Sequence, residues 1–124
     1  MEESPLKKKS YSFALKIISA YKQIVSEKKE YVLSKQFLDA GTSIGALIRE
    51  AEFAQSKADF ISKMNIALKE SNETEYWICL LRDSEFITIE TANNLKNDNQ
   101  ELLRMLISSI KTAKQNSNRS LTNN

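Results

Sequence analysis

The feature that most constrains the fold of this chain is an apolar repeat with steps of three and four residues that runs almost without glycine or proline. The 124 residues include 2 Gly and 1 Pro, which leaves few of the turn residues that an all-β or alternating α/β fold needs. Apolar residues three and four apart line one face of an α-helix. The sequence therefore predicts an all-α fold in a single domain, with long helices and short links.

Four segments carry the repeat, at about 10–28, 32–55, 59–82 and 88–114. Ser10 and Thr88 are candidate N-caps, and Asp59 suits a first helical turn. The polar segment 1–9 precedes the first helix and includes Ser4-Pro5, a further cap and first-turn pair. Polar residues at 96–100 predict a kink or a frayed turn, and the Asn- and Ser-rich tail 115–124 is expected to be disordered. Short links predict an antiparallel, up-down-up-down four-helix bundle.

The third helix has more apolar stripes than a surface helix needs. Beside its main stripe it carries Ile61, Leu68 and Tyr76, and a third row contains Ile66 and Trp77. A helix that is apolar on several sides is normally covered on several sides. We therefore expect copies of the chain to self-associate.

The second helix contains two glycines four residues apart, Gly41 and Gly45. Glycine costs about 1 kcal/mol relative to alanine inside a helix, so the pair indicates a close neighbour. Together with Leu38 and Thr42 the glycines lie away from the predicted core stripe. We expect this face to form part of a subunit contact, or else to pack closely against helix one or four of the same chain.

Charge is unevenly distributed, although the formal net charge is only +2. Residues 1–49 carry +4, residues 50–104 carry −5 and residues 105–124 carry +3. The predicted topology gathers basic side chains at one end, where they could contact phosphate, face acidic regions of another subunit, or simply be solvated. These candidate phosphate contacts are Lys7, Lys8, Lys9, Lys57, Lys111, Lys114 and Arg119.

The chain has no histidine, which excludes Ser/His/Asp and Cys/His catalysis and the Glu-x-x-His di-iron pattern. Gly41 to Gly45 lacks the Gly-Lys-Ser/Thr ending of a phosphate-binding loop. The single Cys79 is expected to be an inert apolar residue. No apolar run is long enough to span a membrane and the N-terminal residues lack a signal pattern. We expect a cytoplasmic, non-enzymatic protein with no cofactor, no metal and no membrane partner.

Glutamates 50, 70, 73 and 101 lie near apolar stripes. Four carboxylates in a bundle suit a metal, but pairing with Arg49, Lys69, Arg104 or backbone groups, or across a subunit boundary, is the more ordinary interpretation. Tyr76 and Trp77 are similarly read as core residues, with stacking on a nucleobase as the alternative.

The chain resembles the bacterial four-helix bundle proteins first noticed as reading frames in intervening sequences of large-subunit ribosomal RNA genes. The resemblance covers about Ser10 to Ile110. It is carried by the segments Ser10–Ile18, Leu33–Gln36, Gly41–Ala46, Asp59–Lys63, Ile66–Glu70 and Glu73–Trp77.

The resemblance implies an antiparallel bundle that assembles as a ring, typically a homopentamer. The accessory variability determinant proteins of diversity-generating retroelements are similar in fold, basic, and bind nucleic acid. This chain departs from the common pattern at Asp39, where a basic residue is usual, and at Leu47 and Arg49. Asp39 weakens the nucleic-acid expectation and leaves the fold expectation intact.

Two functions from different classes follow. In the first, an oligomer presents basic bundle ends to RNA or DNA phosphates without reading bases. In the second, the protein is a structural adaptor or scaffold that docks another protein and has no nucleic-acid role.

Overall fold

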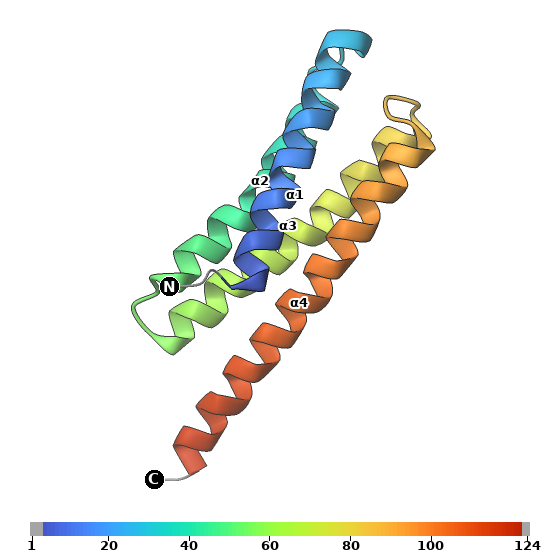
Figure 1. Ribbon diagram of the computed structural model, residues 1–124. Coiled ribbons are helices and arrows are strands. Elements are labelled where there is room, and N and C mark those ends of the chain that lie inside the picture. The colour runs from blue at the N-terminus through green and yellow to red at the C-terminus, as the bar shows by residue number, and fades with distance from the viewer. Residues whose placement is uncertain (1–3, 123–124) are drawn as a thin grey trace.

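The computed structural model describes the backbone of residues 4–122 and the side-chain environments of residues 4–116. Over the described residues the chain contains four α-helices and no strand. The elements are α1 (Pro5–Gln23), the π-helical turn η1 (Ile24–Lys28), α2 (Leu33–Glu52), α3 (Lys57–Asp83) and α4 (Ile89–Thr122). Consecutive helices run antiparallel, as the short links predict (Figure 1).

The first helix begins five residues earlier than the repeat predicts. Ser4 is its N-cap, because the Ser4 hydroxyl accepts a hydrogen bond from the Lys7 amide at 3.1 Å, and Pro5 occupies the first turn. The expectation that the helix starts at Ser10 was therefore wrong. Ser10 lies inside α1, is buried, and donates its hydroxyl proton to the Lys7 carbonyl. The cap and proline pair outweighs the lack of apolar residues among Lys7, Lys8 and Lys9.

The turn between α1 and α2 is built from a π-helical turn, a left-handed residue and a carboxylate cap. Lys29 has φ 53° and ends η1. The Glu30 carboxylate then accepts hydrogen bonds from the amides of Val32, Leu33 and Ser34 at 2.8–3.0 Å. Burial alone would raise the pKa of Glu30, but these amide hydrogen bonds outweigh it and lower the pKa. The side chain of Glu30, three residues before the first residue of α2, thus caps this helix.

The other helix boundaries differ less from prediction, except at the C-terminus. Ser56 caps α3, which starts at Lys57 rather than Asp59. Thr88 accepts from the Thr91 amide at 3.1 Å, which confirms it as the cap of α4. The tail predicted to be disordered from 115 is helical as far as Thr122, and 123–124 lie outside the described residues. No Gly or Pro follows Ala113 to end the helix, so the last polar turns extend α4 beyond the start of α3 (Figure 1).

The core follows the predicted stripes closely. The third helix buries Met64, Ala67, Ser71, Thr74, Ile78 and Leu81, with Phe60 half-buried. Its other rows are more exposed than we expected, since Ile66 and Tyr76 are 41% and 60% exposed. The contacts between α2 and α3 are the most extensive, and those between α1 and α4 are the least extensive of the four helix-helix pairs in contact.

The α4 helix is not frayed at 96–100, where a kink or a frayed turn was predicted, and the polar residue on the stripe there belongs to a buried pair. Asn99 is fully buried at 0% exposure. Its carbonyl oxygen accepts from the Ser71 hydroxyl at 2.7 Å, and its amide donates to the Ser71 backbone carbonyl at 3.0 Å. The polar residue on the stripe is therefore satisfied inside the core, and α4 continues through 96–100 without interruption.

Candidate functional site

The predicted phosphate-contacting lysines gather at the end of the bundle that holds the start of α1, the α2–α3 link and the last part of α4 (Figure 1). Two of them are already paired. Lys7 contacts Glu52 at 2.8 Å, and Lys9 contacts Asp98 and Glu101, each at 3.0 Å. Both lysines are therefore less available to a phosphate than a free lysine. Arg119 belongs to α4, but its side chain lies outside the described part.

Four other basic side chains at this end are free. Lys8, Lys57, Lys111 and Lys114 are exposed and make no ion pair among the side chains that the structure describes. Solvated ammonium groups that form no ion pair attract an anion more strongly than paired ones. They are the best-placed members of the predicted set.

Asp98 joins α1 to α4 through two lysines. Its carboxylate oxygens lie 3.0 Å from the Lys9 ammonium and 2.7 Å from the Lys16 ammonium, and its side chain is only 17% exposed. Burial alone would raise the pKa of Asp98, but the hydrogen bonds from Lys16 and Lys9 outweigh it and lower the pKa. The side-chain hydrogen bond with Glu101 is the main reason that the pKa of Lys9 is raised.

Replacing Asp98 by Asn is expected to cost about 1 kcal/mol at neutral pH, because the network loses its charge-assisted bonds. A lowered folded pKa contributes stability above the ordinary Asp value of 3.8 and loses it as pH falls through the folded pKa. Urea titrations of the wild type and D98N should therefore differ at pH 7 and converge at strongly acidic pH. D39N removes an exposed pair with Lys35 within one helix and should have a smaller effect. A difference that stays constant with pH would contradict this account.

The glycine face packs against helix α1 of the same chain. A Cβ on Gly41 would lie 2.7–2.8 Å from side-chain carbons of Ile17, and a Cβ on Gly45 would lie 3.4 Å from the Ser10 hydroxyl. Close packing on helix one was one of the two predicted arrangements, and it accounts for both glycines. Leu38 and Thr42 are half-buried beside them, and Thr42 donates its hydroxyl proton to the Leu38 carbonyl.

The acidic residues near the stripes do not form a metal site among the described residues. Two of these glutamates have other partners than the expected side chains: Glu50 lies 3.9 Å from Lys63, and Glu101 pairs with Lys9. Glu70 has a raised pKa, because of burial first and the neighbouring Glu73 carboxylate second. These glutamates are spread over α2, α3 and α4 and do not form a cluster that could hold a metal ion.

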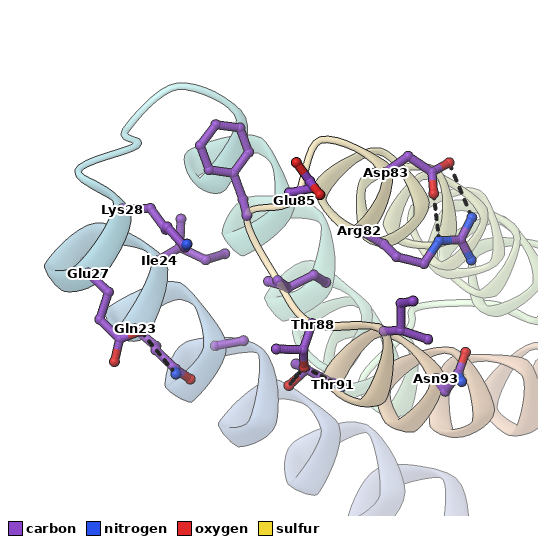
Figure 2. Close-up of a pocket in the computed structure, with 14 residues that line it drawn as sticks. Gln23, Ile24, Glu27, Lys28, Arg82, Asp83, Glu85, Thr88, Thr91 and Asn93 are labelled. Carbon is purple, nitrogen blue, oxygen red and sulfur yellow. Dashed lines mark hydrogen bonds and ion pairs between the residues drawn. The ribbon is translucent and has the colours of Figure 1, made fainter.

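One hollow was not predicted from sequence. It has a volume of about 750 Å³ and lies at the opposite end, between η1 and the α3–α4 link (Figure 2). Its apolar walls include Ile24, Phe86 and Ile89, and the Arg82–Asp83 ion pair lies at its edge. The signal available in the sequence was Phe86-Ile87 in a segment that we treated only as a link. Among the groups drawn in Figure 2, the hydrogen bonds and the ion pair join residues that are near neighbours in sequence.

The fold and these sites can now be compared with known proteins. Residues 2–108 match the family model for the 23S rRNA-intervening sequence protein. The chain belongs to this family. A solved structure of a protein with unknown function from the S23 ribosomal protein family of Bacteroides thetaiotaomicron is 58% identical, with a TM-score of 0.84. The match covers 86% of this chain and 98% of that one. No curated protein matched.

Membership in the 23S rRNA-intervening sequence protein family agrees with the resemblance stated above and with the four-helix fold. The family description points to no catalytic residue. The described side chains include neither a histidine nor a cluster of metal ligands. Among the described helices, none combines the length and the apolar character of a bilayer span. The free lysines of this family member are thus the best-defined candidate site.

Proposed function

We propose that this protein is a non-enzymatic accessory that binds the phosphate backbone of RNA or DNA through one end of its bundle. The observation that supports this most directly is the set of exposed, unpaired lysines drawn from three separate segments: Lys8 on α1, Lys57 at the start of α3, and Lys111 and Lys114 on α4. Residues 105–124 add basic groups and no acidic one. The association of the family with ribosomal RNA intervening sequences and the resemblance to accessory variability determinant proteins agree with the proposal.

Lysine ammonium groups interact with phosphates as point charges and do not read base edges. Binding through them releases counterions, so affinity falls as salt rises. We therefore expect binding without sequence preference. Asp39, paired with Lys35 on α2, lies outside the lysine-bearing segments and does not weaken this end.

The test is fluorescence anisotropy with labelled RNA at several salt concentrations. Reversing two charges, K8E with K57E, should lower affinity about tenfold or more and reduce the salt dependence. K22E provides a matched control, because Lys22 is exposed but lies in the last turn of α1, at the far end of the bundle. Binding that is unaffected by salt, or lost equally in K22E, would refute the proposal.

We further propose that the protein works as a ring-like oligomer, with the homopentamer implied by the resemblance as the expected size. Among the side chains of residues 4–116, nine large apolar ones are between 41% and 77% exposed. Two of them, Tyr11 and Leu15, lie four residues apart on α1 and so share one face. On α2, Gly41 and Gly45 pack against α1. Leu38 and Thr42 lie beside these glycines and remain partly exposed, so they can contribute to a subunit contact.

Replacing Tyr11 and Leu15 together by lysine should shift the mass measured by light scattering towards the monomer, because charged side chains oppose burial. Replacing the exposed Ser12 by lysine is the control. A wild-type protein that is monomeric at high concentration would overturn the oligomer proposal directly.

The second candidate function, an adaptor that docks another protein, is favoured by one surface. Glu70 and Glu73 make no ion pair within the described part, and the neighbouring Ile66 is 41% exposed. An acidic surface with an exposed apolar residue suits a basic, amphipathic partner. Affinity purification from the native host that recovers nucleic acid but no protein would count against this function.

A further inference from the structure

We infer that the outer face of the α3–α4 pair is a path for single-stranded nucleic acid, on which Tyr76 stacks a base while basic residues hold the phosphates. This inference rests on the proposed nucleic-acid binding and extends it from the end of the bundle to one side. The sequence reading placed Tyr76 in the core. The structure leaves it 60% exposed, so that reading was wrong for Tyr76, and the exposed ring needs a different explanation.

Spacing places the relevant side chains on one face. On α3, Asn65, Lys69, Asn72 and Tyr76 follow steps of four, three and four and are all exposed. On α4, Gln100, Arg104, Ile107, Lys111 and Lys114 follow the same kind of spacing and are exposed or half-buried. Residues three and four apart on a helix are neighbours, so each set forms one stripe.

Two observations show that the stripes adjoin. Gln100 donates a hydrogen bond to the Glu75 carboxylate at 3.3 Å across the seam, next to Tyr76. Farther along, Asn65 and Leu68 of α3 line a hollow of about 360 Å³ together with Ile107, Lys111 and Lys114 of α4. Lys111 and Lys114 therefore border this hollow, on the part of α4 that also contributes to the lysine-bearing end of the bundle.

Charge complementarity identifies the occupant. Lys69, Arg104, Lys111 and Lys114 make no ion pair among the described side chains. Two carboxylates on α3 adjoin these four cations: Glu75, which is bonded to Gln100 across the seam, and the exposed Glu73, which neighbours Lys69 and Tyr76. The cations therefore outnumber the adjoining carboxylates. A row of free cations with an exposed aromatic ring is the combination that tracks a flexible phosphate backbone and stacks unpaired bases, whereas duplex bases are not accessible for stacking. The partner is therefore single-stranded.

Tyr76 is held in place by the only tryptophan. The ring centroids of Tyr76 and Trp77 are 5.1 Å apart in an edge-to-face arrangement, at 74°. Because Trp77 is half-buried and unique, its fluorescence reports on events at the neighbouring tyrosine. This gives a signal that a general loss of charge would not change.

The experiment uses the full chain with labelled oligouridylate of about 12 nucleotides, within the usual range of single-strand site sizes, and a duplex of equal length. Y76A should weaken binding of the single strand about tenfold and leave duplex binding unchanged. Y76F should retain binding, and Y31A, which truncates another exposed tyrosine in the turn before α2, should match the wild type. Oligouridylate should also change Trp77 fluorescence in the wild type but not in Y76A.

Single-strand binding that is identical in Y76A and the wild type would overturn this inference while leaving the proposed function intact. Loss of affinity in R104E but not in Y76A would have the same meaning, because it would show phosphate contacts without stacking. Failure to bind either probe at low salt would overturn the proposed function, and the inference with it. Circular dichroism of each variant establishes that the helices are retained.

Discussion

Replacing Asn99 by Asp is expected to destabilise the protein by about 3 kcal/mol or more at pH 7, because the new carboxylate would be a buried charge. Asn99 is inaccessible to solvent and its amide donates to the Ser71 carbonyl. A carboxylate cannot donate there, so two acceptors would face each other. Urea denaturation followed by circular dichroism measures the loss.

The pH dependence of N99D provides a second measurement. Burial raises the folded pKa of a carboxyl group, so the deficit is absent below the unfolded Asp pKa of about 3.9 and grows as pH rises above it. N97D is the matched control, since Asn97 lies on α4 but is exposed, and it should change stability by less than about 0.5 kcal/mol. A deficit for N99D no larger than that for N97D would mean that water reaches position 99.

Alanine substitutions at the two glycines are expected to have opposite signs. Each substitution favours the helical state by up to about 1 kcal/mol, because alanine has a higher helix propensity than glycine. At Gly41 the added methyl group would lie 2.7–2.8 Å from carbons of Ile17, which is itself completely buried, and overpacking typically costs about 1–3 kcal/mol. At Gly45 the nearest atoms are 3.4–3.6 Å away, an ordinary van der Waals distance. G41A should therefore lower the melting temperature and G45A should raise it or leave it unchanged.

A G41A variant that is more stable than the wild type would contradict this prediction, because it would show that Ile17 or the α1 backbone can shift to accept the added methyl group at little cost. The double variant G41A/I17V tests the mechanism, because removing one methylene from Ile17 should recover part of the loss. I17V alone should be mildly destabilising, as expected for a deletion in a packed core.

The sequence allowed most of the helical architecture to be predicted, because the stripes on α2 and α3 are set by apolar side chains such as Phe37, Ile44 and Met64 that are buried as expected. Helix boundaries were less predictable, because local hydrogen bonds set them. Ser4 and Pro5 begin α1 before the apolar repeat does, and Glu30 caps α2 from outside the helix. The end of α4 was missed because composition alone does not terminate a helix.

The candidate sites were predictable only in part. Topology placed the lysines at one end, but the ion pairs of Lys7 and Lys9 depend on the rotation of α1 relative to α4. Asn99 looked like a break in the repeat because its partner, Ser71, lies 28 residues away. The exposure of Tyr76 likewise depends on how far α4 covers α3, which no local pattern specifies.

The pattern of contacts between helices has a consequence for folding kinetics. The extensive interfaces join helices that follow one another in the chain, and only the α1–α4 seam connects the two ends. Such a low contact order favours rapid folding. We expect hairpins of successive helices to form first. The packing of α1 against α4, in which Lys9 and Lys16 form their ion pairs with Asp98, is then the last step of folding.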